Sequence, residues 1–335
     1  MKGFILIALC LFIFSLPLLA QDEGVLAHYG TLKIGGVMQS TFTYEMDTTL
    51  DAQTYFALKR SRLLFWGTIV TDQIKYFIQT EGLASPYILD TKLIFDGFIP
   101  QTSVAIGRFC PAFTHYMPRS TAKLDLINYP LIVQNYAMWK QCGAQTTTKT
   151  DYIDFNLGVF NGYGSSRTSD NNDAKDALVA TTIKAAEFIK FIGYGWFGNM
   201  LMADETDLAS NRFGGGAIVN YPLNEQMSVT VKGEYVMGTN GMGEGIDDLK
   251  SAGFYGHVGF NVNPQIELLG RYENFDPDAD TDYDAMTWIT GGANYRLDGE
   301  HAKISANYIM KQSEVAAGVD DVMDDQFIMQ FQLFF

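Results

Sequence analysis

The sequence contains little cysteine, proline and histidine, and this scarcity excludes several classes of protein. The chain has 335 residues, with only three cysteines, nine prolines and four histidines. A disulfide-rich scaffold is excluded by the cysteine count. None of the histidines stands in a recognisable catalytic motif, and no metal-ligand spacing is evident. We therefore expect that the chain is not an enzyme, and His115 is the one histidine to test if an activity were sought.

Positive charge and long apolar runs are scarce as well. Lys and Arg number 23 against 38 Asp and Glu, which gives a formal net charge of −15. Nucleic acid is not expected as a partner of such an acidic chain. Beyond the N-terminal segment, no stretch stays apolar for the roughly 18 residues that a membrane-spanning helix needs. Any function in a membrane would therefore require a β-barrel.

The N-terminal segment has the pattern of a secretory signal peptide. Lys2 precedes an apolar run from Phe4 to Leu16, and a small residue, Ala20, follows. A membrane anchor is the alternative, but the run is short and acidic residues follow it directly. We predict cleavage after Ala20, which leaves residues 21–335 as a single exported domain.

The rest of the chain alternates apolar and polar residues with a period of two, which is typical of strands with one apolar face. The clearest case is the last segment, where one face holds Phe327, Met329, Phe331 and Leu333 and the other holds Gln326, Gln330 and Gln332. Read at helical spacing, such segments scatter charge over every face, so amphipathic helices are excluded. A soluble β-sandwich also alternates, and periodicity alone leaves it open.

The lengths of the connections favour a barrel over a sandwich. We predict sixteen strands near residues 31–46, 55–71, 74–82, 87–95, 102–109, 139–148, 152–161, 177–185, 189–197, 212–220, 227–238, 250–262, 266–275, 286–295, 303–311 and 326–335. Short and long connections alternate between most of them, as in bacterial barrels with short periplasmic turns and long external loops. The sequence predicts an all-β, transmembrane antiparallel barrel in the bacterial outer membrane, with both ends of the mature chain on the periplasmic side.

The longest connection, from Cys110 to Met138, follows the fifth strand. It contains Pro111, Pro118 and Pro130, which hinder strand pairing. A sixteen-stranded barrel is too wide for side chains to fill, so we predict that this third external loop folds into the bore and narrows it. An ordinary surface loop is the alternative. Cys110 and Cys142 flank the loop, and the sequence leaves open whether they form a disulfide or remain two free thiols.

Four short motifs together resemble the phosphate-selective porin O and P family. They are KRSRL at 59–63, GRF at 107–109 followed by Pro111, NYP at 128–130 and GVFNG at 158–162. The resemblance runs over most of the mature chain and is strongest from about residue 55 to 165. It implies a sixteen-stranded channel that is a homotrimer, with an inward third loop. It also implies passive diffusion of small hydrophilic solutes, including anions such as phosphate, across a membrane of lipid and lipopolysaccharide.

The resemblance also indicates which residues line the pore. By motif position these are Arg60, Arg62 and Arg108, with Lys59 less certain. The inward loop adds Arg119 and Lys123, and Arg271 stands among the other charges expected in the lumen. Arginine side chains can bind an oxyanion bidentately and exchange it with water. Pairing with carboxylates on neighbouring strands is the alternative role.

Acidic segments favour other interpretations. A carboxylate stands at every second position in Asp276, Asp278, Asp280 and Asp282, which could bind a structural Ca²⁺, although the segment is no EF-hand and a solvated loop is the alternative. Acidic external loops also suit a scaffold or adhesin barrel with a closed bore. Acidic loops around the outer entrance of the barrel repel anions, whereas arginines in the lumen attract them.

Overall fold

The computed structural model describes residues 25–26, 30–46, 51–71, 73–83, 85, 87–162, 169–170, 172–201, 206–315 and 324–335. The predicted signal peptide and its cleavage site lie outside these residues, as do Asp204, Glu205, Asp320 and Asp321 of the acidic segments. No helix within the described part of the chain is long and apolar enough to cross a membrane.

Sixteen long strands, β2 to β17, form one antiparallel sheet in which each strand pairs with the next along the chain. They are β2 (Thr31–Glu45), β3 (Gln53–Val70), β4 (Ile74–Glu81), β5 (Tyr87–Ile99), β6 (Thr102–Phe109), β7 (Gln141–Lys149), β8 (Ile153–Phe160), β9 (Asp176–Ala186), β10 (Ile189–Leu201), β11 (Asp207–Pro222), β12 (Ser228–Asn240), β13 (Leu249–Asn261), β14 (Ile266–Asp276), β15 (Met286–Asp298), β16 (Ala302–Ser313) and β17 (Gln326–Phe334). A two-residue strand, β1 (Val25–Leu26), pairs with the start of β2.

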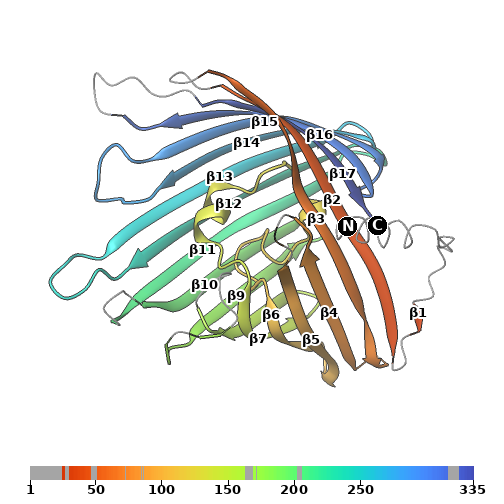
Figure 1. Ribbon diagram of the computed structural model, residues 1–335, viewed down its shortest axis with the longest axis vertical. Coiled ribbons are helices and arrows are strands. Elements are labelled where there is room, and N and C mark those ends of the chain that lie inside the picture. The colour runs from red at the N-terminus through yellow and green to blue at the C-terminus, as the bar shows by residue number, and fades with distance from the viewer. Residues whose placement is uncertain are drawn as a thin grey trace, which may run out of the picture.

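The sheet closes on itself, because β17 pairs with β2 from Gln326 opposite Glu45 to Phe334 opposite Val37. Figure 1 shows the resulting barrel with tilted strands. All sixteen predicted strands are confirmed. The largest difference concerns β10 and β11, which continue their pairing as far as Leu201 and Asp207, so the predicted long connection from 198 to 211 is reduced to 202–206.

Short and long connections separate onto the two ends of the barrel. The seven connections at one end have two to five residues, while the eight at the other end, which we call L1 to L8 in chain order, reach 31 residues in L3 (110–140). Along each strand, side chains alternate between bore and exterior. In β14, for example, Glu267, Arg271 and Glu273 are buried on the inner side, whereas Leu268 and Tyr272 are exposed on the outer side.

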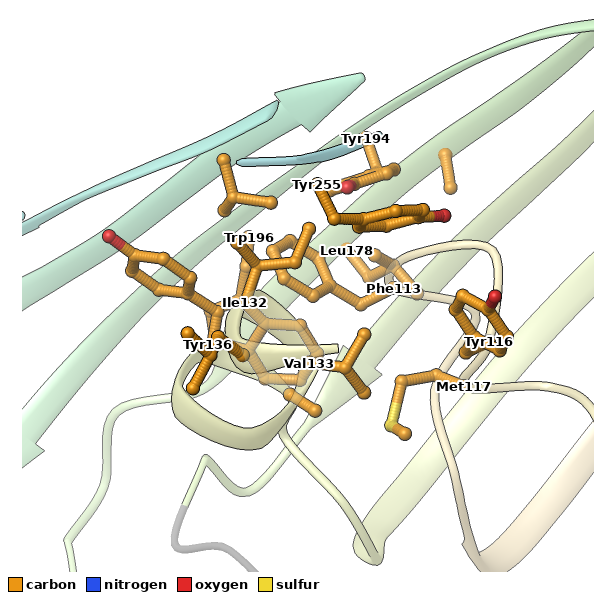
Figure 2. Close-up of a cluster of buried hydrophobic side chains, with 14 of the residues drawn as sticks. Phe113, Tyr116, Met117, Ile132, Val133, Tyr136, Leu178, Tyr194, Trp196 and Tyr255 are labelled. Carbon is orange, nitrogen blue, oxygen red and sulfur yellow. The ribbon is translucent and has the colours of Figure 1, made fainter. Parts of the chain in front are cut away.

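L3 folds into the bore, as predicted. It contains the short helices η1 (Thr121–Lys123) and α2 (Leu131–Tyr136), and α2 contacts β12, β13 and β14. Figure 2 shows Phe113, Ile132 and Val133 of this loop packed against Tyr194 and Trp196 of the wall. The barrel thus has its hydrophobic core between L3 and one wall, because only there do two layers of chain face each other.

Cys110 and Cys142 form no disulfide with each other, which resolves the alternative that the sequence left open. Gln141 and Gln145 of β7 face the interior, so Cys142 between them points to the other side of the wall. Cys110 lies at the start of L3 and lines the cavity described below. The two sulfur atoms therefore lie on opposite sides of the sheet.

We expect Gly107 to be essential for the wall beneath L3. Its φ is +137°, and a Cβ there would stand 2.2 Å from the carbonyl oxygen of Thr91. Gly107→Ala should lower the free energy of unfolding by about 1–3 kcal/mol, because a strained backbone and a steric clash are added together. Urea unfolding in detergent, followed by tryptophan fluorescence, measures this. Gly256→Ala is the control, since no heavy atom lies within 4 Å of its Cβ position; equal effects of both variants would contradict the expectation.

Candidate functional site

The backbone of L3 is held by side chains of the opposite wall. Glu234 of β12 accepts a hydrogen bond from the backbone N–H of His115 at 2.9 Å, and Glu273 of β14 accepts one from that of Leu131 at 2.6 Å. The Oδ1 atom of Asn307 accepts a third, from Ile127, at 2.8 Å. Because L3 crosses the bore without pairing as a strand, these contacts satisfy peptide groups that would otherwise be buried without partners.

Two buried ion pairs reinforce this attachment. Asp125 of L3 binds Lys232 of β12 at 2.5 Å, and Tyr116 donates a hydrogen bond to the same carboxylate. Burial opposes ionisation of Asp125, but the nearby ammonium of Lys232 outweighs it and holds the pKa of Asp125 below its usual range. Arg271 pairs with Glu273 at 2.7 Å and donates to the carbonyl oxygen of Asn128.

Acidic side chains on this wall of the barrel are therefore buried. Glu234, Glu267 and Glu273 are each at most 5% exposed. Arg271 is 4% exposed and is bound to Glu273 and to the loop backbone. Of the predicted pore-lining residues, Arg271 is thus the one that the structure places behind L3.

The other half of the bore contains a cavity of about 1840 Å³ between L3 and the wall formed by β2 to β9. It extends toward the short-turn end of the barrel, where His301 and Phe334 line it. Its lining includes two carboxylates, Asp90 and Asp154. It also includes eleven cationic residues: Lys33, Lys59, Arg60, Arg62, Lys75, Lys92, Arg108, Arg119, Lys123, Lys140 and Lys149. A chain with 38 acidic and 23 basic residues thus builds a cavity of strongly positive character.

A β-bulge in β3 directs two adjacent cations into this cavity. Gln39 of β2 lies opposite Arg60, but its neighbour Ser40 lies opposite Leu58, so Lys59 is the extra residue. A bulge turns neighbouring side chains toward the same face. This explains why Lys59, whose position the sequence left uncertain, lines the cavity beside Arg60.

Arg60 and Lys59 bind neutral groups. The Nη1 atom of Arg60 donates to Oε1 of Gln39 at 2.6 Å, and its guanidinium lies 5.8 Å from the centre of the Tyr129 ring. Lys59 donates to the side-chain oxygen of Asn128. Neither has a carboxylate within 4.0 Å in the part of the chain that the structure describes. Their charges are therefore not neutralised by a neighbouring acid.

Arg62 has the other predicted role, as a structural partner. Its Nε atom binds Glu81 at 2.8 Å, and its Nη1 atom donates to Thr121 of L3. Lys140 is paired in the same way with Asp90 at 2.6 Å. The two roles weighed for the lumen arginines thus fall on different residues.

The remaining predicted residues, Arg108, Arg119 and Lys123, all line the cavity. Arg119 lies 3.0 Å from Nε2 of His115. Burial, together with the positive charge of Arg119, lowers the pKa of His115 to about 3, so this ring is neutral at pH 7. Sequence reasoning missed Lys33, Lys140 and Lys149 as lining residues. For Lys33 and Lys149, alternation along their strands was the available signal.

Two of the four aspartates of the predicted calcium segment, Asp276 and Asp278, accept backbone hydrogen bonds within tight turns. Asp276 accepts a hydrogen bond from the backbone N–H of Asp278, which accepts one in turn from Asp280. Asp280 also pairs with the exposed Lys250. Across the described residues, no three His, Cys, Asp or Glu side chains are grouped as a metal site would require. Binding of Ca²⁺ here stays a prediction without geometric support.

The fold and the cavity together define a porin-type β-barrel. The solved structures to which the chain is similar are outer-membrane barrels. An anion-selective porin from Comamonas acidovorans has a TM-score of 0.69 at 14% identity, covering 91% of this chain and 100% of that chain. The outer membrane channel DcaP of Acinetobacter baumannii has a TM-score of 0.68 at 11% identity, covering 93% and 100%. A trimer form of OmpT from Vibrio cholerae has a TM-score of 0.63 at 12% identity, covering 92% and 100%.

The sequence comparison identifies the family that the chain resembles. Residues 224–335 match the model of the family described as phosphate-selective porin O and P. The resemblance is thereby confirmed, but over β12 to β17 rather than over residues 55–165, where the motifs stand. No curated protein sequence matches the chain.

We expect Glu273 to be required for the position of L3. Glu273→Gln leaves the buried charge of Arg271 without its partner, which costs about 3–5 kcal/mol. Local release of L3 should then accelerate tryptic cleavage after Arg119 and Lys123 at least about a hundredfold. Asp154→Asn is the control, because its pair with Lys184 is partly exposed and contributes about 0–1 kcal/mol. Unchanged cleavage in a folded Glu273→Gln barrel would refute this role.

Proposed function

We propose that the chain is an outer-membrane porin for passive diffusion of small hydrophilic solutes, with a preference for anions, phosphate among them. The observation that carries this proposal is the segregation of charge inside the barrel. Eleven cations and two carboxylates line the cavity, while Glu234 and Glu273 are buried where they bind the backbone of L3. Water-exposed cations in a confined, low-dielectric passage raise the local concentration of anions.

Both sides of the cavity contribute to this preference. Lys59 and Arg60 project from the barrel wall, whereas Arg119 and Lys123 project from L3. An anion that passes L3 therefore meets positive charge on each side. Arg60 binds Gln39 and Tyr129 rather than a carboxylate, so its guanidinium can exchange these neutral partners for an oxyanion.

The acidic outer loops oppose entry of anions but act over a short range. Glu244, Asp247 and Asp248 of L6 are exposed to solvent. Fields of exposed charges decay within about 8 Å at physiological ionic strength. The cavity cations are screened less, because protein surrounds them. We therefore expect the cavity to determine the sign of selectivity and the loops to reduce its magnitude at low salt.

Selectivity should be measured with the purified protein in a planar bilayer. In a potassium chloride gradient, the wild-type reversal potential should have the sign of chloride passage. The double variant Lys59→Gln/Arg60→Gln should lower the chloride-to-potassium permeability ratio severalfold, because two cations without carboxylate partners are lost. Lys250→Gln is the control, since Lys250 lies outside the cavity and pairs with Asp280.

Two outcomes would contradict the proposal. A potassium-selective wild-type channel would show that the acidic mouth dominates. A folded barrel without conductance would favour the alternative function, a scaffold or adhesin with a closed bore whose external loops bind a partner.

A homotrimer in the outer membrane, in contact with lipid and lipopolysaccharide, is part of the proposal. Its support in this chain is a change of chemistry around the outer wall. Ser40, Ser61, Thr80 and Thr91 occupy outward positions on β2 to β5, between residues that face the bore. β3 extends beyond the end of its neighbour β4, and this extension carries Phe56, which is 83% exposed. Hydroxyl groups are better matched by a protein partner than by lipid tails.

We expect this wall to be the contact between subunits. Ser61→Arg should convert trimers to monomers in detergent, because a charge would enter the interface unpaired. Val231→Arg, at an exposed outward position on the apolar wall of β11 to β13, is the control and should leave the mass unchanged. Light scattering coupled to size exclusion measures both. A trimer that survives Ser61→Arg would place the contact elsewhere.

A further inference from the structure

A row of four cavity-lining side chains runs across adjacent strands β2 to β5. The register places Lys33 opposite Trp66, Trp66 opposite Phe77, and Phe77 opposite Lys92. All four line the cavity. Directly opposed residues on neighbouring strands project to the same face. The row therefore presents two aromatic residues on adjacent strands with a lysine on the strand to either side, and we call it the aromatic platform.

The cations at both ends lack acidic partners. The Lys92 ammonium lies 5.5 Å from the centre of the Phe77 ring and 5.3 Å from that of Phe109. Lys33 is exposed. In the described part of the chain, no carboxylate lies within 4.0 Å of either ammonium. Aromatic faces hold a cation without pairing it with an acid, so the Lys92 ammonium remains available to an anionic solute.

Glycines stand beside the platform at both ends. The Trp66 ring lies over Gly35 of β2, since a Cβ at Gly35 would be 3.0 Å from the Cζ3 and Cη2 atoms of that ring. At the other end, the row continues beyond Lys92 with Gly107 and then Gly143, neither of which has a side chain to cover the rings. Three strand spacings separate Lys33 from Lys92 along the sheet, about 14 Å between backbones.

We propose that the aromatic platform binds planar aromatic carboxylates and selects them from among the anions that enter the cavity. This inference rests on the proposed anion preference and specifies the solute. A flat ring can stack on Trp66 or on Phe77 while its carboxylate binds the ammonium of the adjacent lysine through a charge-assisted hydrogen bond. Inorganic anions and short aliphatic carboxylates gain only the second contact. The aromatic rings therefore select solutes that contain a planar ring, and the lysines select solutes that carry a negative charge.

The test compares benzoate with acetate as inhibitors of the chloride current through the protein in a planar bilayer at pH 8, where both are ionised. The dissociation constant of benzoate should be about three- to tenfold lower than that of acetate, as expected for one stacked aromatic pair. The double variant Trp66→Leu/Phe77→Leu should abolish this ratio while acetate binding remains. Its chloride current also reports that the barrel is folded.

Tyr87→Leu is the matched control, because Tyr87 lines the cavity two rows away, opposite Glu81. This variant should keep the wild-type ratio of benzoate to acetate affinity.

A ratio near one in the wild type, or a high ratio that survives Trp66→Leu/Phe77→Leu, would overturn the platform while leaving anion selectivity intact. A wild-type reversal potential whose sign indicates passage of potassium would instead overturn the proposed function, and the platform with it. Should the double variant fail to conduct, Phe77→Leu alone should lower the ratio, and an unchanged ratio there would also count against the platform.

Discussion

The interior of this barrel depends on how the peptide groups of L3 are satisfied. A loop that crosses a sheet-lined bore has no ladder partner, so each buried N–H and C=O needs a side chain or water. The wall supplies these partners through Glu234, Glu273 and Asn307, which accept from the loop backbone. Lys303 donates to the loop carbonyls of Ala122 and Leu124. Leaving such groups unpaired would cost about 1–3 kcal/mol each, which fixes L3 against one side.

This attachment explains the segregation of charge. Glu234 and Glu273 of the wall accept hydrogen bonds from the backbone of L3, and Arg271 pairs with Glu273 there, while Lys232 pairs with Asp125 of the loop. The space opposite L3 then contains mostly cations. The same loop thus narrows the bore and removes negative charge from it. A single set of buried contacts therefore links the stability of the loop to the selectivity of the passage.

Within the cationic half, the paired and unpaired residues have different uses. Arg62 and Lys140 bind Glu81 and Asp90, so they connect the wall to L3 and stiffen it. Arg60, held by Gln39 and Tyr129, keeps its charge. The aromatic platform adds a second kind of surface, because opposed residues on neighbouring strands combine apolar rings with cations. The charge of a solute and the shape of a solute can then be recognised by different residues of the same cavity.

The sequence determined the local and periodic features. The alternation of apolar and polar residues predicted all sixteen strands, since a wall between two environments requires a period of two. Prolines in the 110–138 segment predicted a loop that cannot join the sheet. What the sequence left undecided was pairing, because it placed Arg60, Arg62, Arg108 and Arg271 in the lumen without showing which of them bind carboxylates.

Only the tertiary structure assigned these charges, because the path of L3 decides which face of the bore is covered. It placed Arg271 behind the loop, turned Lys59 inward through a bulge, and aligned Lys33, Trp66, Phe77 and Lys92 in one row. The four residues of this row lie up to 59 positions apart in the chain. Their proximity depends on strand register, which local patterns do not encode because a shift by two residues preserves every inward and outward position.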